Sequence, residues 1–462
     1  MYIRKRRNKL GSISIQIVEN QGRAIRIVKH IGTGKAQSEI AKHVQTAKNF
    51  LIQDQIALFD PSLQAEMLLK GIEINQTYLI GFQEVFGTIY DRIGYPKDSM
   101  LKDLVVGRIA RPVSKLALAR FLQEKTGKSI TDDDIYRFMD TVGVEQEQSI
   151  TNHTFQFVQT LLQEGIHIIF FDATTLHFET FSSDNFRKTG FSKVGKHNQP
   201  QIVIGLMVTR EGLPIGYDVY PGNEFDGFTI RSALRRVARR YKVDDVVFIA
   251  DSAMMSSHNV ELIEQSGFKF ILAARIKNMS SHYTNQILNH MNFTNNILDI
   301  EYGRHRLVVS YSVDRARKDR MDREKNIEHI KRSLTKREKV TRSKMGKIGK
   351  SKYLQVSGEA EVSINYEAVS RDAQWDGLKG YMTNIPSEQL SPQDVIARYT
   401  DLWQIERAFR LAKSDLKVRP IYHFKRERIR AHILLVFMSL FVCKYTEYLL
   451  QDLKITTARL IE

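Results

Sequence analysis

The sequence has very little cysteine and no apolar segment long enough to cross a membrane. Cys443 is the only cysteine among 462 residues, which excludes an intramolecular disulfide framework and favours a reducing, cytoplasmic setting. The longest apolar stretch, residues 433–442, is shorter than the roughly 20 residues that a membrane-spanning helix needs, so we expect a buried helix there. The basic N-terminus MYIRKRRNK lacks the apolar segment of a signal peptide, and no tandem repeat recurs at solenoid spacing.

Acidic residues are also scarce relative to basic ones. The chain holds 69 Lys and Arg against 52 Asp and Glu, a formal net charge of +17. Such an excess indicates a polyanionic partner, with nucleic acid as the leading candidate and an anionic membrane surface as the competitor. Residues 315–352 alone hold sixteen Lys and Arg and five Asp and Glu. A charged run of this kind is usually a solvated helix or loop, but as a group these residues suit contacts with phosphates.

The first 163 residues divide into a short β region and a longer helical region. Residues 12–18 and 23–28 alternate apolar and polar side chains around a turn, which predicts an antiparallel hairpin within residues 1–35. Residues 36–163 follow the helical period, and we expect this region to bind DNA. Their short helices are compatible with helix-turn-helix motifs, but the period does not distinguish these from a plain helical bundle. We expect helices near residues 37–52, 81–93, 100–109, 113–124, 132–142 and 153–162.

The pattern changes to mixed α/β after residue 164. Three β-type runs, IHIIFFDATTLHFET, QIVIGLMV and LPIGYDVY, are followed by a helix, the strand VVFIAD, a second helix and the strand FKFILAA. This βββαβαβ order over residues 164–275 is that of the ribonuclease H-like fold, with a mixed sheet. Residues 276–390 no longer follow this alternation of strands and helices and are expected to form a β-rich, basic inserted domain. Residues 391–417 would then supply the final helix of the core, and residues 418–462 a C-terminal helical region.

Three carboxylates are placed to meet in this fold. Asp172 lies inside the first long strand, where an unpaired charge would be costly to bury. Asp251 ends the strand VVFIAD, and ligand sites of α/β sheets lie at the carboxyl ends of parallel strands. Glu406 lies on the final helix. Each acid alone has an ordinary structural alternative: a hydrogen-bonded strand acid, a turn or helix-cap acid, and a surface ion pair of Glu406 with Arg410 one turn later.

Together the three acids would form an all-oxygen metal site. Carboxylates without His or Cys favour Mg²⁺, with Mn²⁺ as a substitute, over zinc. Two such ions could activate an oxygen nucleophile and stabilise the leaving oxygen at phosphorus. Tyr399, Leu402, Arg410 and Lys413 share the helical period of Glu406. Arg410 and Lys413 could neutralise phosphate charge, and together with Tyr399 they would bind the DNA and position the phosphates of the transferred end.

The chain resembles insertion-sequence transposases of the DDE type, in the IS4-like superfamily and its IS1634/IS1549-type branch. The resemblance covers nearly the whole chain and rests on the blocks FFDATTLHFET, QIVIGLMVTREGLPIGYDVYPGNEFD, VVFIADSAMMS, WDGLKGYMTNI and YTDLWQIERAFRLAKSDLKVRPIYHFKRERIRAHI. It implies Asp172, Asp251 and Glu406 as metal ligands. Tyr399, Glu406 and Lys413 match the Tyr/Arg/Glu/Lys signature helix of the family, whereas Leu402 occupies its arginine position. Arg398, Arg407 or Arg410 would have to supply that DNA contact.

The resemblance further implies a transposase that cuts the ends of its element and joins them to target DNA. It implies double-stranded DNA as partner, a homodimer in the synaptic complex, association with the bacterial nucleoid, and no membrane. Trp375 could stack on an unpaired base near the cleaved end, although a core tryptophan is the commoner role. Relatives usually continue with more helical sequence, which leaves open a truncated copy. Two other functions remain open: a ribonuclease H-fold nuclease that cuts without joining, and a non-catalytic or decayed DNA-binding remnant.

Overall fold

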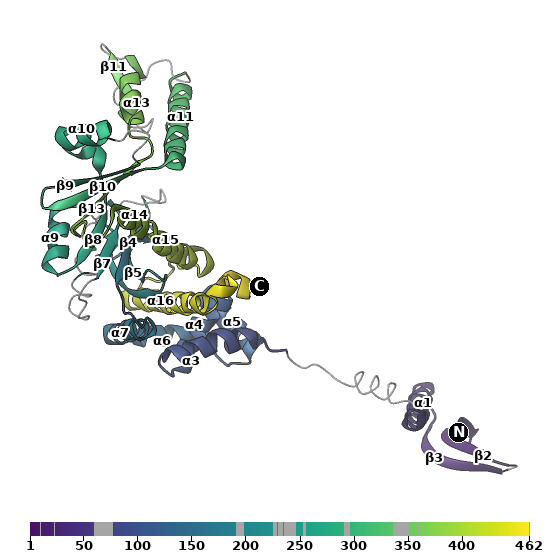
Figure 1. Ribbon diagram of the computed structural model, residues 1–462. Coiled ribbons are helices and arrows are strands. Elements are labelled where there is room, and N and C mark those ends of the chain that lie inside the picture. The colour runs from purple at the N-terminus through teal and green to yellow at the C-terminus, as the bar shows by residue number, and fades with distance from the viewer. Residues whose placement is uncertain are drawn as a thin grey trace. The chain divides into compact units, whose positions relative to one another are not determined.

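The computed structural model describes residues 1–461 except residues 10, 23, 60–76, 191–197, 225–228, 230–233, 235–245, 253–255, 291–295, 336–350 and 358–360. The chain divides into two compact units, Met1–Thr77 and Tyr78–Glu462. Figure 1 labels their helices and strands. Most of the helix expected between the third and fourth strands of the core, and residues 336–350 of the basic run, lie outside the described residues.

The first unit is a three-stranded antiparallel sheet with one helix. The expected hairpin is present as β2 (Ile13–Gln21) and β3 (Ala24–Gly34), and β1 (Tyr2–Arg7) adds a strand that was not predicted. Helix α1 (Gln37–Phe59) packs on this sheet, so it belongs with the strands rather than with the helices that follow. Ile13, Ile15 and Ile17 lie two residues apart on one face of β2, and the core consists of Ile15, Ile17 and Ala47 with partly buried neighbours.

The second unit begins with helices that share a core with the C-terminal helix. Helix α16 (Arg426–Leu449) is buried along most of its length and packs against α4, α6 and α3 (Figure 1). In the part of the chain that the structure describes, α16 alone is long and apolar enough to suit a membrane span, but 94% of its apolar window is buried inside the protein. The predicted buried helix is therefore confirmed. The other elements are η1 (Gln83–Gly87), α3 (Thr88–Ile93), α4 (Ser99–Ala110), α5 (Lys115–Thr126), α6 (Asp132–Thr141), α7 (Val144–Leu161) and α17 (Thr457–Ile461).

A mixed sheet of eight strands forms the centre of the second unit. Its order is β6-β5-β4-β7-β8-β13-β10-β9. The first five strands follow the predicted succession of three antiparallel strands and two parallel ones, with β4 central and parallel to β7. Near-continuous apolar runs account for this placement, because both faces of the central strands are covered. The bounds are β4 (Ile168–His177), β5 (Gln201–Thr209), β6 (Pro214–Pro221), β7 (Val247–Ala250), α9 (Ser257–Gln265) and β8 (Lys269–Ala274).

Residues 276–390 differ from the expected separate β-rich domain. Their strands β9 (Ile297–Tyr302), β10 (His305–Tyr311) and β13 (Leu378–Thr383) extend the central sheet beyond β8. Among the described residues of the segment, β11 (Leu354–Ser357) and β12 (Glu361–Ile364) form a separate two-stranded ribbon. The described part also contains the helices α10 (Ser281–His290), α11 (Val313–Thr335) and α13 (Tyr366–Ala373). The sequence did not reveal this arrangement because strand pairing across about a hundred residues leaves no local pattern.

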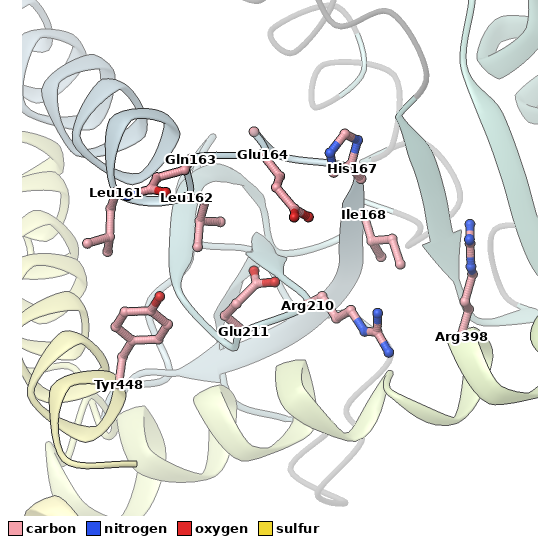
Figure 2. A pocket seen from close by; sticks show the side chains of 11 residues that line it. Leu161, Leu162, Gln163, Glu164, His167, Ile168, Arg210, Glu211, Arg398 and Tyr448 are labelled. Carbon is pink, nitrogen blue, oxygen red and sulfur yellow. The ribbon is translucent and has the colours of Figure 1, made fainter. Parts of the chain in front are cut away.

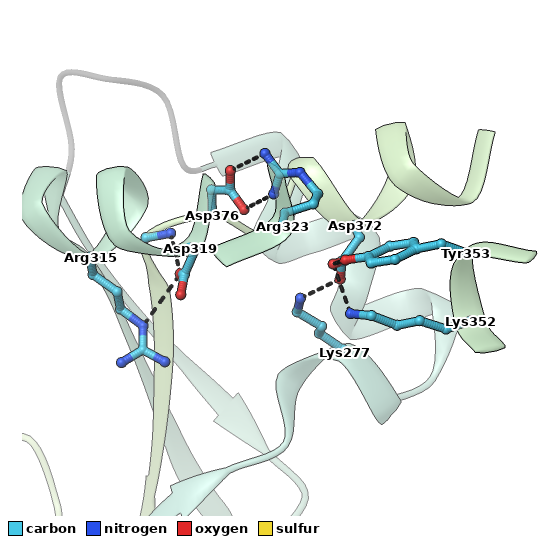
Figure 3. A network of polar contacts seen from close by, with 9 residues as sticks. Lys277, Arg315, Asp319, Arg323, Lys352, Tyr353, Asp372 and Asp376 are labelled. Carbon is cyan, nitrogen blue, oxygen red and sulfur yellow. Dashed lines mark hydrogen bonds and ion pairs between the residues drawn. The ribbon is translucent and has the colours of Figure 1, made fainter. Parts of the chain in front are cut away.

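A network of ion pairs fixes the turn that leads into β13 (Figure 3). Arg323 of α11 binds both carboxylate oxygens of Asp376, and the Gly377 N–H donates to Asp319 at 3.0 Å. Asp372 accepts hydrogen bonds from three side chains, which hold its pKa well below its ordinary value although partial burial opposes the shift. These donors are Lys277, Lys352 and Tyr353. The basic helix α11 and strand β13 are thereby held together.

Candidate active site

Asp172 and Asp251 follow paired residues on neighbouring parallel strands. Phe171 of β4 is in register with Ala250 of β7, and each acid is the next residue of its chain segment. Asp172 is half-buried and accepts a hydrogen bond from the Ala173 N–H at 2.8 Å, whereas Asp251 is exposed and accepts one from Ser252 at 2.6 Å. Because adjacent strands lie about 4.8 Å apart, the backbones that carry the two carboxylates are close neighbours.

Glu406 reaches the same region from the helical segment after β13. Helix α15 (Trp403–Arg410) packs against β4 and β5 and leaves Glu406 exposed. Among the described residues Glu406 makes no hydrogen bond or ion pair, so the alternative in which it pairs with Arg410 is wrong for this structure. Arg407 instead pairs with Glu447 of α16 at 3.1 Å. The carboxylate of Glu406 is therefore not engaged in an ion pair with any residue that the structure describes.

Tyr399 lies within electrostatic reach of all three acids. Its side chain is 4% exposed at the end of α14 (Pro392–Thr400). Burial raises the pKa of Tyr399 most, and the negative charges of Asp251, Asp172 and Glu406 raise it further. In the described part of the chain, however, no three His, Cys, Asp or Glu side chains are close enough to form a ready-made metal site. The acids thus share one neighbourhood around the Tyr399 ring without forming a closed coordination sphere.

Lys379 of β13 is a cation in this neighbourhood that the sequence did not single out. Its ammonium group lies 4.2 Å from the ring centroid of Tyr399 and 5.6 Å from that of Tyr381. Burial lowers the pKa of Lys379, the charge of Arg315 lowers it further, and Asp251 and Glu406 act in the opposite direction. The sequence block LKGYM could have indicated Lys379, because residues 379 and 381 are two positions apart and therefore lie on the same face of a strand.

Lys413 is at the other end of the signature motif from Tyr399, and its side chain lies near Asp172. Its ammonium group donates to Thr174 Oγ1 at 2.5 Å. Thr174 and Asp172 point to the same face of β4 because they are two residues apart. The Lys413 side chain also lies over the Phe409 ring, at 5.1 Å from its centroid. Lys413 is therefore anchored next to the first acid.

The predicted continuous helix over residues 391–416 is interrupted. Helix α14 ends at Thr400, α15 begins at Trp403, and a π-helical turn η5 (Leu411–Asp415) follows α15. Leu402 lies in the break with 9% of its surface exposed and belongs to the apolar core. The position that carries arginine in the family signature is thus a core position in this chain, where an arginine would lose its hydration.

The three arginines expected to replace that cation are differently placed. Arg407 is paired with Glu447, and Arg410 is exposed without a partner in the described part of the chain. Arg398 lines a cavity of about 570 Å³ at the start of β4, together with Arg210 and Glu211. Figure 2 shows Arg398 and Arg210 on the walls of that cavity. Arg398 therefore lies near the N-terminal end of β4.

Trp375 packs at the edge of a small apolar cluster. Its half-buried ring contacts the core formed by Ile276, Ile287, Leu307, Val309 and Leu378. This packing gives Trp375 a structural role in the apolar cluster. Stacking of Trp375 on a base stays a prediction.

Residues 163–442 match the family model described as Transposase DDE domain. This match covers more than half of the chain, so the protein belongs to the family of DDE transposase domains. Members of this family use divalent metal ions.

Two transposases of insertion sequences from Bacillus thuringiensis share short stretches with this chain. The transposase for element IS231E, from subspecies finitimus, is 30% identical over 99 residues, 21% of this chain and 20% of that protein. The transposase for element IS231F, from subspecies israelensis, is 34% identical over 77 residues, 17% of this chain and 16% of that protein. The chain therefore matches about a fifth of the length of these relatives.

Solved transposase structures show only distant similarity. A piggyBac transposase synaptic complex with hairpin DNA aligns over 84% of this chain and 79% of that chain, with a TM-score of 0.42 and 9% identity. A pre-cleavage Mos1 transpososome aligns over 48% of this chain and 75% of that chain, with a TM-score of 0.17 and 11% identity.

Proposed function

We propose that this protein is the transposase of an insertion sequence, which hydrolyses phosphodiester bonds at the element ends and joins the freed 3′-hydroxyl to target DNA. The observation that carries this proposal is the position of Asp172 and Asp251 after paired residues of β4 and β7. Tyr399, which lies in the field of both acids and of Glu406, supports their joint action. Membership of the DDE transposase family supports this type of reaction.

The donor set suits a hard divalent cation. Asp172, Asp251 and Glu406 offer carboxylate oxygens only, which Mg²⁺ and Mn²⁺ prefer and zinc does not. These residues would hold the metal, which when bound supplies an activated oxygen nucleophile and charge stabilisation at phosphorus. The exposed Asp251 and Glu406 can approach a substrate phosphate without unfolding of the core.

The cations around the acids would hold the scissile strand. We assign the role of the missing signature arginine to Lys379, because its ammonium group lies over Tyr399 and in the field of Asp251 and Glu406. Lys413 would bind a phosphate on the Asp172 side, and the exposed Arg410 would bind one further along the strand. The aromatic ring of Tyr399 would hold the ammonium group of Lys379 in position through the cation–π contact.

Duplex DNA is the proposed partner, with a dimer in the synaptic complex. The residues before 163 would recognise the element ends, and the first unit contributes a strongly basic strand, YIRKRR, to this task. Stacking of Trp375 on a base belongs to the same proposal. We also place the protein in the IS1634/IS1549-type branch and in the bacterial cytoplasm at the nucleoid, on the sequence blocks described above.

The test is cleavage of a duplex that carries the terminal repeat of the element, with Mg²⁺ in the buffer. Asp251→Asn preserves shape and removes the charge, so we expect at least a hundredfold loss of cleavage with unchanged duplex binding. Asp314→Asn is a matched control, since Asp314 is 93% exposed on α11. An Asp251→Asn protein that cuts as fast as the parent would overturn the assignment.

The products decide among the three functions. A transposase yields molecules in which the 3′-end of the element is joined to target DNA, whereas a nuclease of the same fold yields cut ends only. A DNA-binding remnant would shift the duplex in a gel without any metal-dependent cleavage. We expect joined products, which the last two functions exclude.

A further inference from the structure

A second polar cavity lies away from the three acids, between the helices of the N-terminal half and the segment before α16. Its volume is about 500 Å³. Helices α4 and α5 form one wall, and residues 417–423 and α16 form the other. None of its lining residues is acidic, whereas six are basic or can become so: Arg108, Lys115, Lys417, Arg419, His423 and His432.

The floor of this cavity consists of buried basic side chains that have no acidic partner among the described residues. Arg108 and Lys115 are each 4% exposed, and His432 is 6% exposed. Within the described residues, Lys115 Nζ, Arg108 Nε and His432 Nδ1 have no hydrogen-bond acceptor or donor opposite them. The partners present are backbone carbonyls, since Arg108 Nη2 donates to Lys417 O at 3.0 Å and His432 Nε2 lies 3.1 Å from Val418 O.

Such an arrangement is expensive for a protein that folds alone. A buried ammonium or guanidinium group without an anion costs several kcal/mol, and neighbouring like charges add to this. Accordingly, burial and then the charge of Arg108 lower the pKa of Lys115 well below its ordinary value, and burial lowers the pKa of Arg108 to about 10. Cations retained at such a cost are typical of binding sites.

The N-terminus of helix α5 also contributes to the cavity. Ser114 is the N-cap of this 12-residue helix, its Oγ accepts from the Ala117 N–H at 3.3 Å, and both residues line the cavity with Lys115. Amide groups at a helix N-terminus carry partial positive charge and bind anions. Two independent features, the unpartnered buried cations and the helix terminus, thus favour the same kind of ligand.

We propose that this cavity binds a phosphate group. Tyr422 lines the cavity and is 65% exposed, which suits stacking on a base next to the bound phosphate. The neighbouring Ile421 N–H donates to His177 O at the end of β4, five residues after Asp172. At about 3.3 Å per strand residue, the five residues from Asp172 to His177 span roughly 17 Å. This inference rests on the proposed function in so far as the phosphate belongs to a DNA strand that extends from the acids along β4 toward the cavity. The same chemistry would accept free orthophosphate, and the two sources are separated by experiment.

The experiment uses the full chain without divalent metal, so that cleavage plays no part in it. The variant is Lys115→Met, which keeps the length of the side chain and removes its charge. The control is Lys125→Met, an exposed lysine in the last turn of the same helix. The two readouts are the thermal midpoint in inorganic phosphate against NaCl of equal ionic strength, and the affinity for a duplex of the element end.

We expect phosphate to raise the midpoint of the parent and of Lys125→Met but not of Lys115→Met. Loss of one charge-assisted contact should weaken duplex binding by Lys115→Met about 10- to 100-fold. Without ligand, Lys115→Met should be at least as stable as the parent, because an unpaired buried charge is gone; a lysine with a purely structural role would give a less stable protein. Lost phosphate binding with unchanged duplex affinity would assign the cavity to free phosphate. Equal phosphate and duplex binding by Lys115→Met and the parent would overturn the proposal.

Discussion

Replacement of Lys379 by methionine is the most informative perturbation of the proposed active site. The ammonium group of Lys379 lies 4.2 Å from the centroid of the Tyr399 ring, in the field of Asp251 and Glu406. Lys379→Met keeps the aliphatic chain on β13 and removes the charge. If Lys379 replaces the signature arginine, the variant should fold normally and cleave DNA poorly.

The structure gives the expected size of both effects. A desolvated cation–π contact contributes about 0.5–2 kcal/mol, but methionine also removes the cost of burying the ammonium group, so the free energy of unfolding should change by less than about 1 kcal/mol. A hydrogen bond from a charged donor to phosphate contributes about 1.5–3 kcal/mol. Its loss in the transition state corresponds to a roughly 10- to 150-fold slower cleavage step.

The assay is single-turnover cleavage of an end-containing duplex at saturating protein concentration. Lys379→Arg should recover much of the rate because the charge is restored. Lys318→Met, at an exposed lysine of α11, controls for the loss of one positive charge elsewhere. A normal single-turnover rate for Lys379→Met, or a slow rate that Lys379→Arg does not improve, would refute the assignment.

Two further predictions concern stability. Asp376→Asn should lower the free energy of unfolding by about 2–3 kcal/mol in urea titrations, because the Arg323 side chain, only 10% exposed, loses its bidentate partner. The control is Asp314→Asn, which removes the exposed partner of Arg317. Equal losses of stability in the two variants would contradict this prediction. Burial, followed by the charges of Lys115, Arg428 and Arg108, lowers the pKa of His423 to about 4. The unfolded chain, with an ordinary histidine pKa near 6.5, then binds more protons between pH 6.5 and 4, so stability falls as the pH falls, by about 2 kcal/mol between pH 7 and pH 5. His423→Gln should flatten that dependence, and an unchanged slope would count against it.

The parts of the fold that local pattern determines were predictable. The long apolar run around Asp172 and the strand that ends before Asp251 show their type in their own composition. Together with the order of the runs along the chain, this predicted the five adjacent strands from β6 to β8. Helix α16 followed from the apolar stretch of residues 433–442, which only Ser439 interrupts. These features depend on periodicity and strand order, which the sequence displays directly.

The features that escaped prediction depend on distant partners. Leu402 belongs to the core only because α14 and α15 pack on the sheet, so the break between them was invisible to the helical period. Lys379 reaches Tyr399 because β13 pairs with β8, more than a hundred residues earlier. The cavity of Lys115 and His432 joins segments about three hundred residues apart. In each case the decisive contact is tertiary.

The pairing of β13 with β8 has a consequence for how this protein can be altered. Residues 276–390 look in the sequence like a detachable module, yet their last strand is part of the central sheet and supplies Lys379 to the acids. Exchange of the whole segment for that of a relative would therefore replace a component of the active site together with an edge of the core. A functional chimera would need both junctions near the ribbon of β11 and β12, which lies between the sheet strands β10 and β13 in the sequence, so that β13 and Lys379 stay with the core.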